Sequence, residues 1–139
     1  MKPCPFCAIV EGNAGEVVYE DAAALAFLDH NPLAKGHCLL VPRAHVATIF
    51  EADAATLQAL AVASKAVGTA IRAAMAADGL FVGQNNVVSQ SVAHLHVHLV
   101  PRWRDDKLFS HGQMVWRRVR YRDDAERTGI AARIRAEIG

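Results

Sequence analysis

The chain has 139 residues, of which 53% are hydrophobic and 21% charged, values typical of one globular domain. Fifteen basic and fourteen acidic residues give a formal net charge of +1, which argues against duplex nucleic acid or an anionic membrane as a partner recognised by overall charge. The sequence contains no run of about eighteen consecutive apolar residues and no apolar signal-peptide core, so we expect a cytoplasmic protein.

Two cysteines near the start of the chain, Cys4 and Cys7, have C-x-x-C spacing. In a reducing compartment this spacing is typical of metal or redox chemistry rather than of a structural disulfide. The pair could supply half of a tetrahedral zinc site, with two further ligands from elsewhere in the chain. A pair of reduced thiols without metal is the alternative.

The first half of the chain predicts three strands and a helix. Segments 16–20 and 24–28 favour short strands, and 37–41 favours a buried strand ended by Pro42. Apolar and small residues with a period near 3.6 predict a long helix over 53–76.

The second half predicts two more strands, at 80–83 and 92–100, around a polar loop. An Ala-, Glu- and Arg-rich tail predicts a C-terminal helix over 123–138, while 103–122 shows no clean period. Strands on both sides of one long helix, without regular alternation, indicate an α+β fold with a mostly antiparallel sheet of about five strands.

These elements predict one domain spanning residues 1–139. Its core would be 4–102, and 103–139 would form a C-terminal extension that carries the second helix.

Three histidines, His94, His96 and His98, alternate with apolar residues in the last predicted strand. Side chains on a strand alternate between faces, so the three imidazoles would share one face at a spacing of about 6.6 Å. Such a row could be a polar sheet face, a metal site, or a site for covalent catalysis in which a neutral imidazole attacks phosphorus. The periodicity alone does not separate metal binding from covalent catalysis.

The segment resembles the signature of the histidine triad family, in which three histidines alternate with apolar residues after a Gln-Ser pair, here Gln90 and Ser91. The resemblance runs from Cys4 to Arg102 and also includes the Gly-His pair that ends in His37. It implies a nucleotidyl hydrolase or transferase with the HIT-like fold, active as a homodimer in which two sheets join into one.

The resemblance also implies roles for the triad. His96 would attack the α-phosphorus of a nucleotide and carry the nucleotidyl group. His98 would hydrogen-bond phosphate oxygens or the bridging atom, and His94 would support the constellation. Gln90 and Ser91 match residues that contact the phosphate and help the leaving group.

The same resemblance assigns the nucleoside pocket. Asp29 matches the carboxylate that binds the ribose hydroxyls, while Phe6, Ile9 and Phe27 would wall the base pocket. The loop before the triad departs from the family because it is short and has no glycine. Either amide of the pair Asn85 and Asn86 could reach the ribose or the phosphate.

Some histidine triad proteins hold a structural zinc with the cysteine pair, the histidine corresponding to His45 and the first triad histidine, His94. All four residues are present here, so the resemblance implies a zinc site formed by Cys4, Cys7, His45 and His94.

We therefore expect an enzyme that releases a nucleoside monophosphate, AMP in the first instance, from phosphoramidates, adenylates or dinucleoside polyphosphates. The alternative is a zinc-containing nucleotide-binding or interaction module whose catalysis is vestigial. A third possibility, hydrolysis by zinc held on the triad itself, lacks the expected nearby carboxylate.

Overall fold

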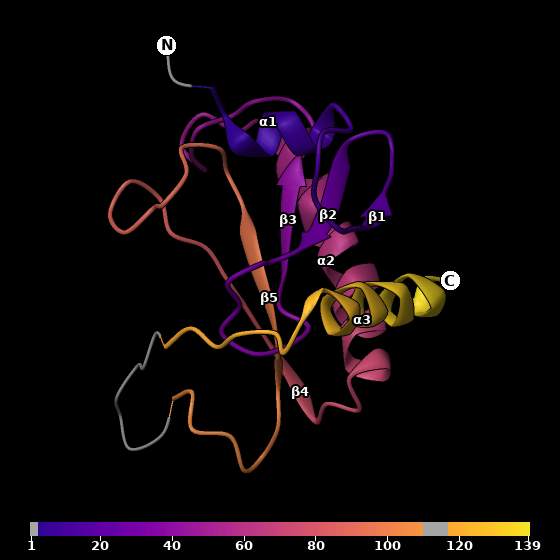
Figure 1. Cartoon of the computed structure of the whole chain (residues 1–139). Coiled ribbons are helices and arrows are strands. Elements are labelled where there is room, and N and C mark those ends of the chain that lie inside the picture. Colours follow the sequence, from indigo (N-terminus) through magenta and orange to yellow (C-terminus); the bar gives the residue numbers. More distant parts are fainter. Residues whose placement is uncertain (1–2, 110–116) are drawn as a thin grey trace.

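The computed structural model describes residues 3–109 and 117–139. Figure 1 shows a twisted sheet with helices packed against it. The elements follow the chain in the order α1 (Pro5–Val10), β1 (Val17–Glu20), β2 (Ala24–Leu28), β3 (Cys38–Pro42), α2 (Ala54–Ala74), β4 (Gly79–Gly83), β5 (Val97–Arg102) and α3 (Asp124–Glu137). The strands form a five-stranded antiparallel sheet in the order β1-β2-β3-β5-β4. The predicted α+β class, the five strands, the long helix and the C-terminal helix are confirmed.

The two faces of the sheet bury different sets of side chains. Alternate residues of β2, β3 and β5 pack on α2 and α3 in the larger core cluster. The intervening residues of β2 and β3 pack against α1 in a smaller cluster of Phe6, Leu25, Phe27, Leu39 and Val41. The triad histidines lie on the second face, because Leu95, Val97 and Leu99 between them point into the larger cluster.

The long helix α2 begins where Asp53 caps it, its side chain accepting a hydrogen bond from the Thr56 N–H at 2.8 Å. Gly68 lets this helix approach the sheet, since a Cβ there would lie 2.5 Å from Leu80. By length and composition α2 could also cross a membrane, a test that core helices of globular domains pass too. Here one face of α2 is buried on the sheet and on α3.

Most predicted boundaries differ from the structure by one or two residues, and two differences are larger. The helix α1 was not predicted, because six residues are too short to show a period. The last strand begins at Val97 rather than at 92 and runs to Arg102. Its expected start leaves the sheet because the Leu95 N–H donates to the carbonyl of Val46, in the loop after β3, at 2.7 Å.

The segment predicted to be irregular, 103–122, contains no helix or strand in its described part. Residues 110–116, including His111, lie outside the described residues. Beyond them, the Val119 N–H donates to the carbonyl of Pro32 at 2.8 Å, which holds the returning chain against the turn after β2.

Candidate functional site

The central histidine, His96, is 2% exposed and lies at the junction of α1 and the sheet. Its ring packs edge-on against Phe6, with 5.1 Å between ring centroids, and Phe6 in turn contacts Phe27. Its Nδ1–H donates to the backbone carbonyl of His94 at 2.8 Å. Because Nδ1 carries the proton, the lone pair is on Nε2. Burial lowers the pKa of His96, so the ring is neutral at pH 7.

The first triad histidine, His94, has both ring nitrogens engaged. Its Nε2–H donates to the carbonyl of Pro42 at 2.9 Å, which leaves Nδ1 as the acceptor. Nδ1 lies 3.3 Å from the sulfur of Cys4 and 3.5 Å from the sulfur of Cys7. Neither nitrogen remains to contact a phosphate, so any contribution of this residue to catalysis runs through its position and its carbonyl.

Four ligand atoms from Cys4, Cys7, His45 and His94 lie within 4.8 Å of one another. The Cys7 sulfur is 3.3 Å from Nδ1 of His45. Tetrahedral zinc with Zn–S near 2.3 Å and Zn–N near 2.05 Å places sulfur and nitrogen ligands about 3.6 Å apart. The observed spacings are close to that value, so the donor set fits a tetrahedral metal ion.

The surroundings of this cluster also suit metal binding. The carbonyl of Pro42 fixes the His94 tautomer that presents a lone pair to the cysteines, as hydrogen-bond partners of metal-binding histidines commonly do. Burial, with a contribution from Cys4, raises the pKa of Cys7, so this residue is a neutral thiol at pH 7 in the absence of a cation. A bound cation would favour its thiolate form.

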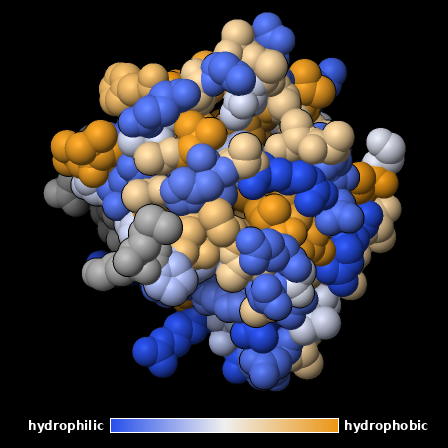
Figure 2. All heavy atoms as spheres, turned by 90° about the horizontal axis from the view of Figure 1, so that it is seen from above, coloured by the Kyte–Doolittle hydropathy of each residue, from blue (hydrophilic) through white to orange (hydrophobic). Residues whose placement is uncertain are grey.

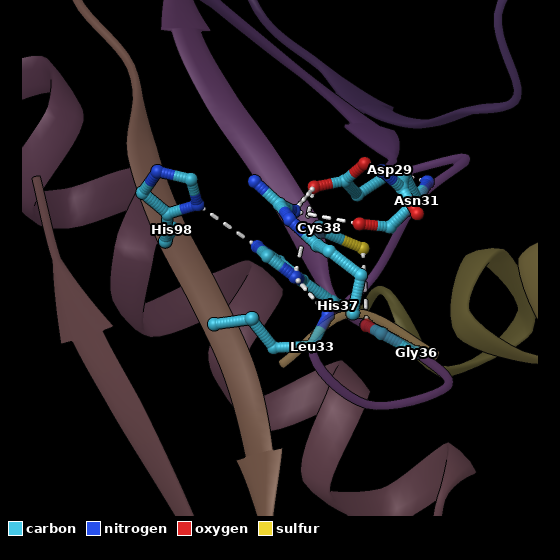
Figure 3. Close-up of polar contacts among 8 residues, drawn as sticks. Asp29, Asn31, Leu33, Gly36, His37, Cys38 and His98 are labelled. Carbon is cyan, nitrogen blue, oxygen red and sulfur yellow. Dashed lines mark hydrogen bonds and ion pairs between the residues drawn. The ribbon is translucent and has the colours of Figure 1, made fainter. Parts of the chain in front are cut away.

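The last triad histidine, His98, belongs to a chain of directed hydrogen bonds (Figure 3). The Leu33 N–H donates to Nδ1 of His37 at 3.0 Å, so His37 carries its proton on Nε2. That Nε2–H donates to Nδ1 of His98 at 2.9 Å. The proton of His98 is therefore on Nε2, the nitrogen that points away from His37 in Figure 3.

Both histidines of this hydrogen-bonded pair, His37 and His98, are neutral at pH 7. Burial lowers the pKa of His37 to about 3 and, together with the neighbouring imidazole of His96, lowers the pKa of His98 to about 4. Asp29, His37 and His98 also lie close enough to be considered as metal ligands. Their hydrogen bonds argue against that reading, because the facing nitrogens of His37 and His98 are already paired with each other.

The carboxylate of Asp29 lies beside His37, on the side away from His98. Its Oδ2 is 3.6 Å from Nδ1 of His37, too far for a hydrogen bond. Its Oδ1 accepts the Asn31 N–H at 2.9 Å, and its Oδ2 accepts Nη1–H of Arg118 at 3.0 Å. The same Nη1 donates to the carbonyl of Asn31 at 2.6 Å.

A cavity of about 400 Å³ lies beside Asp29, between α1 and the outer part of the sheet. Its lining includes all four residues predicted for the nucleoside: Phe6, Ile9, Phe27 and Asp29. The structure thus brings together side chains from α1 and β2 and places Phe6 between this cavity and His96.

The residues predicted from the loop before the triad mainly hold that loop in place. Asn86 accepts the Ile49 N–H at 2.7 Å and donates to Gln84 at 2.8 Å. Gln90 donates to the Ala47 carbonyl and accepts the Val87 N–H. Ser91 is exposed, and the amide of Asn85 donates to the carbonyl of Ser89.

The same loop takes backbone conformations that usually require glycine. Val87 and Ser89 have φ values of 71° and 62°. A β-branched residue such as valine is strained in this region. The loop thus adopts left-handed conformations without glycine, at a cost in free energy.

Seen from above, the molecule carries several apolar patches among hydrophilic residues (Figure 2). In the loop before the triad, Val87 and Val88 are large exposed apolar residues, and Phe50 is exposed in the segment after β3. Arg102, the last residue of β5, donates two hydrogen bonds of 2.8 Å to the carboxylate of Asp106, so its charge is paired within the protein.

Sequence reasoning missed two residues of the site. His37 was noted only as part of the Gly-His pair, and Arg118, the charged neighbour of Asp29, was not noted at all. His37 lies diagonally across from His98, because Leu39, two residues after His37, is the register partner of His98 in the pairing of β3 with β5. No local pattern marks Arg118, because its contact depends on the return of the chain after residue 116.

Comparisons with known proteins agree with this geometry. A family model described as the HIT domain matches residues 11–105. An adenylylsulfatase (HINT3) from Arabidopsis thaliana is 30% identical over 141 aligned positions, covering 99% of this chain and 71% of that protein.

Two solved structures share the fold over nearly the whole chain. A hypothetical histidine triad nucleotide-binding protein from Sulfolobus tokodaii has a TM-score of 0.84 at 33% identity, covering 97% of this chain and 91% of that one. A zinc-bound histidine triad family protein from Mycobacterium smegmatis has a TM-score of 0.83 at 32% identity, covering 97% and 92%.

Proposed function

The chain belongs to the histidine triad family, and from this premise we propose that it cleaves nucleoside monophosphates, AMP in the first instance, from larger groups through a covalent intermediate on His96. The observation that carries the proposal is the fixed tautomer of His96. Its Nδ1–H is held by the His94 carbonyl, so the lone pair of Nε2 is oriented by the backbone and available for attack.

In the first step, Nε2 of His96 forms a bond to the α-phosphorus while the bond from phosphorus to the leaving group breaks. The electron pair of the broken bond departs with the leaving group, and the imidazole carries the positive charge. The Nε2–H of His98, directed by His37, donates a hydrogen bond to the phosphoryl group. A carboxylate, sulfate or phosphate leaves as a stable anion.

An amine leaving group needs one proton more. The exposed hydroxyl of Ser91 could donate it and recover a proton from the attacking water. In the second step, a water oxygen bonds to phosphorus, the N–P bond breaks, and its electron pair returns to Nε2 of His96. The net reaction consumes one water and releases AMP, the leaving group and, for an anionic leaving group, one proton.

We also propose that Cys4, Cys7, His45 and His94 hold a structural zinc ion. The fit of the donor set and the zinc-bound relative support this assignment. The ion would stabilise α1 and fix the carbonyl of His94 that orients the nucleophile.

We infer a homodimer of single-domain chains spanning residues 1–139. The strand β4 lies at an edge of the sheet, where unpaired backbone groups can join a second copy. Val82 on β4 and Val62 on α2 are exposed apolar residues, which supports an interface near that edge. Light scattering should report about twice the chain mass of 15.0 kDa, and a monomer at micromolar concentration would contradict the dimer.

The reaction is tested with purified protein and a substrate panel: an adenosine phosphoramidate, an aminoacyl adenylate, adenylyl sulfate and a dinucleoside polyphosphate. We expect AMP release from at least one, and a transient AMP adduct by intact-protein mass spectrometry after rapid quenching. Failure to release AMP from any of them, with AMP binding retained, would favour the binding-module alternative.

The nucleophile is tested by His96→Asn and His96→Gly. Both variants should keep the fold and AMP binding but lose turnover and the adduct, and imidazole should restore part of the activity of His96→Gly. A His96→Asn enzyme with more than about a tenth of wild-type kcat/KM, a loss below ~1.4 kcal/mol, would show that another group attacks.

A further inference from the structure

Arg118, in the C-terminal segment, places a positive charge beside the proposed site, and the proposed reaction gives this residue no role. Arg118 lies outside the span that matches the family model, residues 11–105. Its guanidinium is 3.0 Å from Asp29, a residue that lines the nucleoside cavity. The contact joins residues 89 positions apart in the sequence.

The position of this arginine is set by backbone contacts. Nη1 of Arg118 donates to the carbonyl of Asn31, and the next residue, Val119, donates its N–H to the carbonyl of Pro32. These contacts attach the segment to the turn that follows β2 and carries Asp29. The side chain is about one third exposed, so a ligand from solvent can reach it.

The charge of Arg118 also reaches the triad. It is among the influences that lower the pKa of His98 and of His37, which places it within electrostatic range of the group that would donate to the phosphoryl oxygens. A positive charge here would attract the anionic phosphate of a nucleotide, which the histidines His37 and His98 cannot do through charge because they are neutral at pH 7.

We infer that Arg118 is a substrate-binding residue that recognises the phosphate of the nucleotide, so that the C-terminal segment completes the site built by the family core. The inference rests on the proposed function and adds to it. Asp29 would accept the ribose hydroxyls while its arginine partner faces the phosphate. The ligand class is thus a nucleoside phosphate, as opposed to a nucleoside alone.

The test compares AMP with adenosine, which differs only by the phosphate. Binding of both is measured by calorimetry for the wild type, Arg118→Met, Arg118→Lys and the control Arg120→Met, an exposed arginine on the same segment. Arg118→Met should weaken AMP binding about tenfold or more while changing adenosine binding less than about threefold. Arg118→Lys should lie between, and Arg120→Met should match the wild type.

A second readout is the salt dependence of AMP binding, which should be steeper for the wild type than for Arg118→Met because exposed charge pairs are screened. Equal losses for AMP and adenosine would overturn the inference and leave Arg118 as a positioning residue for Asp29. Tighter binding in Arg118→Met would also overturn it, since the arginine would then compete with the ribose. Unchanged AMP binding in that variant would overturn it as well.

These outcomes are separable from failure of the proposed function. If the wild type binds no AMP and releases none, the function is wrong whatever Arg118 does. If the wild type binds and turns over its substrate and Arg118→Met behaves like Arg120→Met, only the role of Arg118 is wrong.

Discussion

The two ends of the histidine triad differ in how their rings are held. At one end, His94 lies between the carbonyl of Pro42 and two cysteine sulfurs, so both of its nitrogens are engaged within the protein. At the other end, His98 receives one hydrogen bond from His37 and carries its proton on the opposite nitrogen. The same residue type thus has a structural environment at one end and a proton-directing environment at the other.

This difference shows that identical spacing does not give identical roles. The partner of the second ring nitrogen decides the proposed role. The Pro42 carbonyl directs the lone pair of His94 toward the cysteines, as a metal ligand requires, and the imidazole of His37 directs the proton of His98 to the opposite nitrogen. His96 stands between them and depends on both neighbours, on the carbonyl of the first and the ring of the second.

The largest effect is expected from removal of the cysteine pair at the His94 end. Cys4→Ser/Cys7→Ser should lose bound zinc and about 2–5 kcal/mol of stability, because a metal that binds only the folded state stabilises it. Turnover should fall but persist. Metal analysis and thermal melts measure both effects, with Cys38→Ala as a matched cysteine control that keeps the metal. Complete loss of activity in a folded variant would assign the metal a catalytic role.

The opposite end is tested through His37. His37→Phe removes the donor to His98, so the His98 proton is no longer confined to Nε2, and kcat should fall about 10-fold to 100-fold with little change in KM. Nitrogen NMR of His98 should show a mixture of tautomers, which a merely structural role would not produce. His37→Gln, which restores an N–H donor, should recover part of the rate. An unchanged kcat together with an unchanged tautomer would remove His37 from the mechanism.

The hydrogen-bonded pair His37 and His98 should also make the free energy of unfolding depend on pH. The pKa values of about 3 for His37 and about 4 for His98 lie below the unfolded value near 6.5. Below about pH 6.5, the unfolded chain therefore binds protons at these two histidines that the folded chain does not bind. Stability from these groups is complete above about pH 6.5 and falls as the pH drops toward 4, by at most ~1.4 kcal/mol per pH unit for each group. Denaturant titrations from pH 4.5 to 7.5 measure the slope of the unfolding free energy against pH. His37→Phe should reduce this slope by the contribution of one proton-binding group.

How much of this could be predicted from the sequence depended on whether the signal was local. The helix over 53–76 and the imidazoles on one face follow from periodicity, which needs no tertiary information. The extra helix α1 and the departure of Leu95 from the sheet were missed, because six residues carry no period and a hydrogen bond to Val46 cannot be read from spacing.

The site divides in the same way. The proximity of Cys4 and Cys7 to His45 and His94 was predicted by family resemblance and is present in the fold. The proton direction at His98 was not predicted, because it depends on a backbone N–H from Leu33. Contacts whose geometry depends on a returning chain leave no mark on local sequence.

The short helix α1 has one further consequence. It carries two of the proposed metal ligands, Cys4 as its cap and Cys7, and between them Phe6, which walls the nucleoside cavity. Six residues do not hold a helix in water by themselves, so whatever orders this turn prepares both sites together. Thermodynamic reciprocity then requires that the factor by which zinc tightens nucleotide binding equals the factor by which nucleotide tightens zinc binding. If zinc tightens nucleotide binding, a saturating nucleotide should therefore raise the chelator concentration that removes half of the metal at equilibrium.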